Sequence, residues 1–175
     1  QVDDIVIEKG HDCPDPSNLA TISVGADTAK VNWDPALGTK FLVEWGQNSF
    51  SNDTVVTDSF VTLHNLTGTQ YQVRVADICG QQGQDTSGYS NTITFCSDAL
   101  LPHSRDFSSG FPACWTRSSQ TDVTVQNCNP KGNVLNLNPS WLNNAAATSA
   151  PIDASNVNSI KVAFDWATVC NNTPS

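Results

Sequence analysis

The residue types that most often carry acid–base or nucleophilic chemistry are few and scattered in this chain. Its three histidines, His11, His64 and His103, lie far apart in the sequence. A Ser–His–Asp or Cys–His arrangement needs partner groups within hydrogen-bond reach, and no such partners can be placed beside these histidines. Ser104 and Ser118 lack the flanking glycines of a nucleophile elbow. The pattern favours surface histidines and predicts that the chain is not an enzyme.

Carboxylates are more numerous, with 17 aspartates and glutamates in the chain. A glycosidase needs two of them at a defined separation across the sugar, and the sequence alone places no pair at such a separation. No histidine–cysteine cluster has the spacing of a zinc site. We therefore expect no catalytic cofactor.

The six cysteines are the most informative reactive side chains, and none of them forms a Cys-x-x-Cys motif. Their even number, wide spacing and strand-rich surroundings favour disulfides, which persist in oxidising compartments. The alternative is a set of reduced, buried thiols in a cytosolic protein. We expect the first, and with it an extracellular or cell-surface location.

The net charge and the hydropathy of the chain limit the partners that it is expected to bind. The formal net charge is −9, and charged residues make up 14% of the chain. Sequence-independent binding of nucleic acid uses Lys and Arg on phosphates, so a chain of this charge is not expected to bind nucleic acid. No apolar run approaches the roughly 18 residues of a membrane-spanning helix, and no membrane insertion is predicted.

Short runs of alternating apolar and polar residues predict β-strands through the first half of the chain. The clearest alternations place Val31 with Trp33, Phe41 with Val43, and Val73 with Val75 on one face of a strand. Gly, Asn, Asp and Pro separate the runs, and no helical periodicity of useful length occurs. This rhythm is typical of an all-β sandwich, with strands expected at residues 19–24, 29–33, 41–45, 55–56, 60–63, 71–75 and 92–95.

Part of this region resembles a fibronectin type III domain. The resemblance is carried by Trp33 on the second strand and by Leu66-Thr-Gly-Thr-Gln-Tyr71, which is similar to the family's tyrosine corner. Thr67 stands where the family usually has proline. The resemblance covers residues 13–96 and implies a two-sheet sandwich over residues 13–97. The chain has no Arg-Gly-Asp motif, so nothing in the sequence supports integrin binding.

The second half, residues 98–175, resembles the N-terminal part of a MAM-like or cleaved-adhesin jelly roll from large surface proteins of Bacteroidetes. The resemblance follows the order of segments at residues 101–107, 110–115, 132–137 and 145–152, and a strong strand pattern at 160–166. In that last run Ile160, Val162, Phe164 and Trp166 share one face. A jelly roll has eight strands, so the resemblance implies only part of one.

The start of the chain is interpreted in the same way. Residues 1–9 look like the closing strand of such a jelly roll, and residues 1–12 are expected to be that strand and a linker. The likeness implies the end of one jelly roll, a complete fibronectin type III module and the start of another jelly roll. The alternative is that residues 1–9 add to the partial jelly roll, within this chain or in a neighbouring copy.

The resemblances also imply a disulfide pattern. In a fibronectin type III sandwich the first strand begins at the pole where the sixth strand ends, which implies Cys13–Cys79. Cys96 ends the last strand and Cys114 lies just past the boundary, so Cys96–Cys114 is expected next. Two cysteines are left, and they pair either with each other or with partners outside this segment; the pair would be Cys128–Cys170.

The jelly-roll resemblance implies one candidate metal site. In such modules the closing and opening strands often meet and hold a structural Ca²⁺ through oxygen ligands. Asp3 and Asp4 on the first strand and Asp106 near the opening of the second jelly roll are therefore candidate Ca²⁺ ligands. The alternative is that these aspartates are solvated acids and turn formers.

Surface contacts and modifications complete the candidate sites. Trp141 has a loop-like polar context and could stack on a sugar; the alternative is a packing role in the jelly roll. Asn-x-Ser/Thr acceptor sequences occur at Asn52, Asn65 and Asn171. The Bacteroidetes resemblance implies a second acceptor pattern, Asp followed by Ser or Thr and a small or aliphatic residue, which points to O-glycans on Thr28 and Thr54.

We consider three functions for this set of features. The first is a non-enzymatic structural or adhesive segment of a secreted or cell-surface protein, such as an extracellular fibre, whose partners are copies of itself or adjacent modules. The second is an accessory region of a large secreted hydrolase, in which the jelly roll binds carbohydrate or protein. The third is a phage or host-attachment decoration protein. We expect the first.

Overall fold

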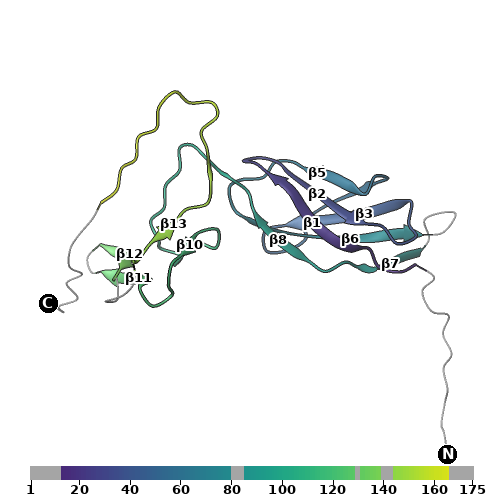
Figure 1. The fold of residues 1–175 in the computed structure, drawn as a ribbon, viewed down its shortest axis with the longest axis horizontal. Helices are drawn as coiled ribbons and strands as arrows, with labels where there is room; N and C mark the ends of the chain where they lie inside the picture. Colours follow the sequence, from purple (N-terminus) through teal and green to yellow (C-terminus); the bar gives the residue numbers. More distant parts are fainter. Residues whose placement is uncertain (1–12, 80–84, 129–130, 139–143, 166–175) are drawn as a thin grey trace, which may run out of the picture. The chain divides into compact units, whose positions relative to one another are not determined.

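β-Strands are the only regular elements in the residues that the structure describes. The computed structural model describes residues 13–79, 85–128, 131–138 and 144–165 (Figure 1). Within these ranges there is no helix, and the ladders are antiparallel apart from one short parallel pair. The predicted all-β fold class is confirmed. No helix in the described ranges is long and apolar enough to cross a membrane.

The chain divides into two units. The first consists of Gln1–Val24, Thr28–His64 and Tyr71–Phe95, and the second of Gly25–Asp27, Asn65–Gln70 and Cys96–Ser175. Two loops of the predicted sandwich therefore belong with the second unit. The reason is backbone hydrogen bonding, because the Asp98 N–H donates to the Gly25 carbonyl at 3.0 Å and the Ser97 N–H donates to the Thr69 carbonyl at 3.1 Å.

One sheet of the first unit has three strands in the order β1-β2-β5, all antiparallel. They are β1 (Ser17–Val24), β2 (Ala29–Asp34) and β5 (Phe60–Leu63). Ala29, Val31 and Trp33 alternate with polar residues along β2, and all three are buried. Because side chains alternate between the faces of a strand, β2 presents one wholly apolar face to the interior.

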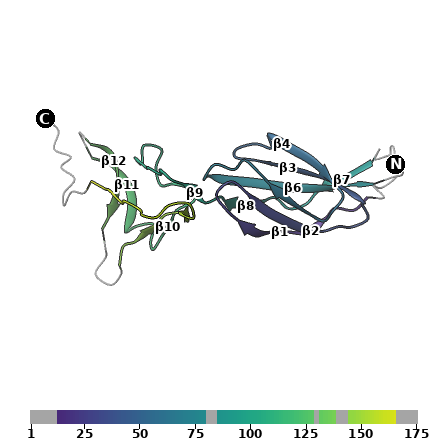
Figure 2. The ribbon, with the colours of Figure 1, turned by 90° about the horizontal axis from the view of Figure 1, so that it is seen from above.

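The other sheet has five strands, in the order β4-β3-β6-β7 with β8 paired to β6. Figure 2 shows β3, β4 and β6 side by side in this sheet. The strands are β3 (Lys40–Gly46), β4 (Asn52–Val56), β6 (Gln70–Cys79), β7 (Asp85–Tyr89) and β8 (Ile93–Cys96). Strands were expected from the sequence at seven of the eight positions β1–β8, and β7 is the one that was not expected.

The two sheets meet through a core of alternating residues. Val31 of β2, Val43 of β3, and Val73 and Val75 of β6 are all fully buried. Trp33 of β2 meets Phe41 of β3 edge to face, with ring centroids 5.3 Å apart. Each fully buried side chain of this size stabilises the fold by about 1.5–3 kcal/mol. The first unit is therefore the β-sandwich that the fibronectin type III resemblance implies.

Tyr71 opens the buried face of β6 at one end of the core. Its ring stacks on Phe95 of β8 at a centroid distance of 5.9 Å, and its hydroxyl accepts a hydrogen bond from the Gln47 side chain at 3.3 Å. The loop before it turns through Asn65 and Gly68, whose φ angles are 61° and 64°. These left-handed conformations suit Asn and Gly and place Tyr71 at the start of its strand.

The second unit consists of short strand pairs. A hairpin joins β11 (Val123–Cys128) to β12 (Gly132–Leu137), and the turn uses Gly132 at a φ of 79°. Two further pairs are β10 (Thr116–Arg117) with β13 (Ala147–Thr148), antiparallel, and β9 (Ala99–Leu100) with β14 (Ile152–Asp153), parallel. The jelly roll predicted for residues 98–175 stays a prediction.

The strand expected at residues 160–166 is absent from the part of that run that the structure describes. Residues 160–165 carry an alternating pattern but have no strand assignment, and no ladder includes them. A strand needs a partner for its backbone N–H and C=O groups, and the described chain brings none to this segment. Trp166, the last residue of the expected run, lies outside the described residues.

Candidate functional site

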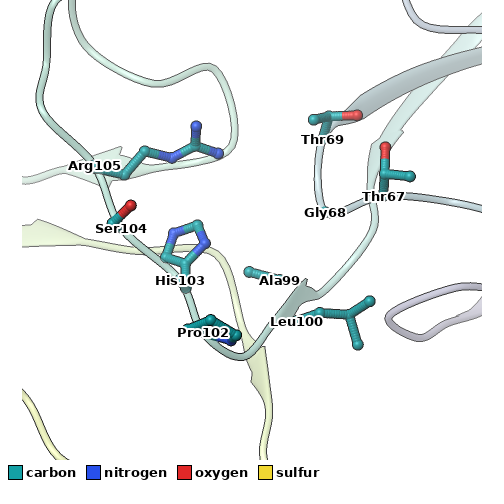
Figure 3. A pocket seen from close by; sticks show the side chains of 9 residues that line it. All are labelled: Thr67, Gly68, Thr69, Ala99, Leu100, Pro102, His103, Ser104 and Arg105. Atoms are coloured by element: carbon teal, nitrogen blue, oxygen red, sulfur yellow. The ribbon is translucent and has the colours of Figure 1, made fainter.

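A pocket of about 350 Å³ lies within the second unit. Its wall on one side is the loop of residues 67–69, and on the other the chain that follows β9 (Figure 3). The side chains of His103 and Arg105 come from that second wall. Its nine lining residues are Thr67, Gly68, Thr69, Ala99, Leu100, Pro102, His103, Ser104 and Arg105.

Close backbone approach holds the two walls of the pocket together. Gly68 is buried with a φ of 64°, and a Cβ added there would lie 3.0 Å from the Cα of Ala99. The Thr69 N–H donates to the hydroxyl of the buried Ser97 at 3.2 Å, and the Ser97 N–H returns a bond to the Thr69 carbonyl. The absence of a side chain at Gly68 therefore lets the two segments approach closely, and Ser97 joins them by hydrogen bonds.

Polar side chains line both walls of the pocket. Arg105 supplies guanidinium donors that match a carboxylate or a phosphate, and it forms no ion pair with any described residue. The Thr69 hydroxyl oxygen is buried without a hydrogen-bond partner among the described residues. Within the same ranges no hydrogen bond joins Ser104 to His103, so their proximity in sequence does not make a nucleophile–base pair.

A cluster of ring and charge contacts covers part of the sheet in the first unit. The Arg74 guanidinium on β6 pairs with Glu44 on β3 at 2.7 Å. The same guanidinium lies 4.0 Å from the ring centroid of Phe50 and 3.7 Å from that of Tyr89. Burial raises the pKa of the Tyr89 hydroxyl, and its hydrogen bond with Glu44 raises the pKa further. The Arg74 charge is satisfied inside this cluster.

Residues 160–165 form an exposed apolar segment. The exposed fractions are 56% for Ile160, 78% for Val162 and 77% for Phe164. No backbone hydrogen bond of the described residues reaches this stretch. An alternating row of large apolar side chains on an unpaired backbone is a template for strand pairing.

Only one of the predicted calcium ligands lies in the described ranges. Asp106 is exposed, and its carboxylate accepts hydrogen bonds from the Ser108 N–H at 3.0 Å and the Ser108 hydroxyl at 2.9 Å. These bonds hold the pKa of Asp106 below its usual value. No group of three or more His, Cys, Asp or Glu side chains in the described ranges is placed to hold a metal. Calcium binding stays a prediction.

The predicted glycan acceptors differ in exposure. Asn52 at the start of β4 and Asn65 in the loop before β6 are exposed, while Thr28 and Thr54 are half-buried. The Asn52 amide donates to the Trp45 carbonyl at 3.3 Å and to the Ser51 hydroxyl at 3.2 Å. Modification of any of the four stays a prediction.

Two of the expected disulfides are present, one in each unit. Cys13 and Cys79 are joined with Cα atoms 5.8 Å apart, and Cys96 and Cys114 with Cα atoms 5.7 Å apart. The third predicted bond pairs Cys128, at the end of β11, with Cys170, which lies outside the described residues. The other candidates that fall outside these residues are Asp3, Asp4, Trp141 and Asn171.

Sequence reasoning missed the pocket and the ring cluster for the same reason. Thr69 and Arg105 are far apart in the chain, and only the backbone bonds between Thr69 and Ser97 bring their segments together. Arg74 alternates with buried valines, which signals a solvent-facing side chain, but nothing in the sequence pairs it with Phe50. Two features of the sequence could have pointed to these sites. Gly68 in the Thr-Gly-Thr turn indicates a close backbone approach, and Arg74 between two valines of β6 indicates a cation on the outer face of the sheet.

Comparison with known proteins shows that about half of the chain is similar to solved structures. No protein-family model matches the chain, and no curated protein matches it. Solved structures similar to it include the fibronectin type III domain of human collagen alpha-1(XX), with 24% identity, a TM-score of 0.45, and coverage of 56% of this chain and 97% of that one. Another is the domain of human fibronectin type III domain containing protein 3, with 18% identity, a TM-score of 0.44, and coverage of 55% and 98%. A computer-redesigned β-sandwich protein is 28% identical, with a TM-score of 0.41 and coverage of 49% and 95%.

Proposed function

We propose that this chain is a non-enzymatic structural or adhesive segment of a secreted or cell-surface protein. It would consist of a fibronectin type III module followed by part of a MAM-like jelly roll. The observation that carries the proposal is the presence of a disulfide in each of two all-β units. Disulfides persist in oxidising surroundings outside the cell, where a spacer or adhesive segment works.

The position of each bond supports this role. Cys13 lies just before β1 and Cys79 ends β6, so their bond ties the first strand of the sandwich to a central strand of the other sheet. Cys96 ends β8, and its bond to Cys114 closes the start of the second unit. A cross-linked strand resists being pulled out of its sheet, which suits a module that transmits force or spaces its neighbours.

The test combines thiol chemistry with location. Protein purified from its source under alkylating conditions is expected to show no more than two free thiols on non-reducing gels and by mass spectrometry. Antibodies against the chain are expected to label intact cells or the culture medium. Four or more alkylated cysteines, or labelling only after cells are permeabilised, would contradict the extracellular assignment. A recombinant chain refolded with and without reductant serves as the reference for each redox form.

The pocket of the second unit supports a second candidate, the accessory carbohydrate-binding region of a secreted hydrolase. The exposed guanidinium of Arg105 offers hydrogen-bond donors of the kind that bind an acidic sugar. A glycan array and calorimetry with uronic acids test this candidate. Saturable binding lost in Arg105→Ala and in Trp141→Ala, and kept when an exposed cation is removed in Lys131→Ala, would favour it over the purely structural function.

A further inference from the structure

Residues 160–165 combine three properties that seldom occur together on a stable surface. Ile160, Val162 and Phe164 are each more than half exposed. The backbone of the segment has no ladder and no backbone hydrogen bond among the described residues. The apolar residues alternate with Lys161, Ala163 and Asp165, so an extended backbone would gather them on one face. Figure 1 draws this stretch as a plain trace without an arrow.

Exposed apolar side chains on an unpaired strand are usually covered by another strand. Strand addition satisfies the backbone N–H and C=O groups, and the side chains of alternate positions supply specificity. The covering strand therefore needs apolar residues two positions apart, and it needs an acidic residue that can lie across from Lys161, the only cation in the segment. These two requirements can be checked against the sequence of the chain itself.

Residues 2–9 of the chain, Val-Asp-Asp-Ile-Val-Ile-Glu-Lys, meet both requirements. Ile5 and Ile7 lie two positions apart, so a strand would place them on one face. In an antiparallel register that sets Ile7 opposite Val162 and Ile5 opposite Phe164, Glu8 falls opposite Lys161. This is the pairing of opposite charges that stabilises neighbouring strands.

If the two strands run parallel, the apolar pairs can be formed as well, and a different acidic residue lies opposite Lys161. When Ile5 lies opposite Val162 and Ile7 opposite Phe164, Asp4 falls opposite Lys161. In both directions Asp165 then faces the remaining acid, Asp4 or Glu8, at the end of the segment. Ile160 falls opposite Lys9 in the antiparallel register and opposite Asp3 in the parallel one. The pairs of Val162, Phe164 and Lys161 therefore favour the register, while the pairs at Ile160 and Asp165 weaken it.

We propose that residues 160–165 accept residues 2–9 of a second copy of this chain as an added β-strand. The inference rests on the proposed structural function and supplies its mechanism of assembly. Each copy would donate a strand with its N-terminal segment and accept one at residues 160–165. Such a contact joins two different surfaces, so it is completed either by reciprocal exchange between two copies or by propagation into rings or open filaments.

The first experiment measures mass against concentration by sedimentation equilibrium and light scattering. The full chain is expected to form dimers or larger oligomers, and the variant lacking residues 1–9 and the variant Val162→Asp are expected to remain monomeric. Leu37→Asp is the matched control, because Leu37 is 69% exposed in the β2–β3 loop of the other unit. That control is expected to assemble like the unaltered chain.

A charge swap identifies the donor and its direction. Lys161→Glu is expected to weaken assembly about tenfold, as the loss of one central charge pair does, while Lys131→Glu, at an exposed turn, should not. Adding Glu8→Lys to Lys161→Glu restores assembly if the strands are antiparallel, and adding Asp4→Lys restores it if they are parallel. Asp165→Lys in the otherwise unaltered chain is expected to strengthen assembly.

A synthetic peptide of residues 1–10 gives an independent check. It is expected to bind the variant lacking residues 1–9 and to protect the amides of residues 160–165 from hydrogen exchange. Oligomers that persist without residues 1–9 would overturn this inference and leave the structural function standing. A full chain that stays monomeric while its own residues 1–9 protect the segment would overturn the role of a second copy.

Discussion

Asp77 is the residue on which one loop of the sandwich depends. It is fully buried on β6, and its Oδ2 atom accepts hydrogen bonds from the N–H groups of Ala36, Leu37 and Gly38 at 3.0, 3.1 and 2.9 Å. A Cβ on Gly38 would lie 2.9 Å from the Asp77 side chain. The loop between β2 and β3 is therefore folded around this carboxylate. Residue 38 has to be glycine because a side chain there would collide with Asp77.

Replacing Asp77 with alanine is expected to lower the free energy of unfolding by about 3 kcal/mol, because three backbone donors lose a charged acceptor. Urea titration followed by tryptophan fluorescence measures the change. Asp58→Ala is the control: Asp58 is exposed in the turn before β5, and its loss should change stability by no more than about 0.5 kcal/mol. Equal effects of the two substitutions would contradict the role given to Asp77.

A second prediction at this scale concerns Asp106, whose pKa is held below 3.8 by the hydrogen bonds from Ser108. A carboxylate with a lowered folded pKa stabilises its turn above the unfolded value, and that contribution is lost as the pH falls through the folded value. The backbone N–H of Ser108 is the larger cause of the lowered pKa and stays in Ser108→Ala, so loss of the hydroxyl is expected to raise the pKa of Asp106 part of the way toward 3.8 in an NMR titration. Ser155→Ala should raise the pKa of Asp153 instead, and an unchanged Asp106 in Ser108→Ala would refute the assignment.

At the scale of elements, pairing between strands creates environments that no single strand has. Glu44 of β3 lies opposite Arg74 of β6 in the antiparallel register, which brings the carboxylate to the guanidinium. Tyr89 of β7 pairs with Ala76 of β6, two positions from Arg74 and on the same face of the strand, and its ring lies over the same guanidinium. Because the side chains of Arg74 and Glu44 are both partly exposed, the ion pair between them contributes only about 0–1 kcal/mol.

This register makes opposite predictions for two substitutions near Tyr89. Glu44 raises the pKa of the Tyr89 hydroxyl, and the Arg74 charge lowers it. Glu44→Gln is therefore expected to shift the pKa of Tyr89 down toward 10.0, and Arg74→Gln to shift it up. A raised tyrosine pKa stabilises the fold below the unfolded value and loses that effect as the pH rises. NMR titration of the Tyr89 ring measures both shifts, and shifts of the same sign would show that the cluster is not formed in solution.

On the scale of the whole molecule, each unit has its own cross-link. The bonds close loops with sequence separations of 66 and 18 residues. Loop-closure entropy grows with the logarithm of loop length, which gives about 4 kcal/mol for the longer loop and about 3 kcal/mol for the shorter. The apolar core of the sandwich adds to the first bond, whereas the second unit consists of strand pairs of only two to six residues.

Removing the bonds one at a time is expected to destabilise different units. Cys13→Ser with Cys79→Ser should lower the unfolding free energy of the sandwich by about 4 kcal/mol and leave it folded. Cys96→Ser with Cys114→Ser should increase hydrogen exchange in the second unit and leave the core of the first protected. Hydrogen exchange with mass spectrometry resolves the two, and a uniform loss of protection across both units would contradict their independence.

Local pattern was enough to determine the all-β class and the buried face of each main strand. Val31 with Trp33, and Val73 with Val75, could be assigned to the interior because strand side chains alternate with a period of two, whatever the partner strand is. The two observed disulfides could be named only through the family resemblances, because local pattern does not say which cysteines meet. The strand β7, with Gly88 and few apolar residues, gave no such signal.

Tertiary structure alone decided what depends on distant partners. The Asp77 carboxylate, the Arg74 cluster and the pocket between Thr69 and Arg105 each join segments that only the folded backbone brings together, and the identity of the partner is not encoded near either residue. The alternating run at Ile160 has the pattern of a strand, yet it is unpaired in the described structure. Pattern determines which face a strand would bury, but a ladder forms only when a second backbone is present to complete its hydrogen bonds.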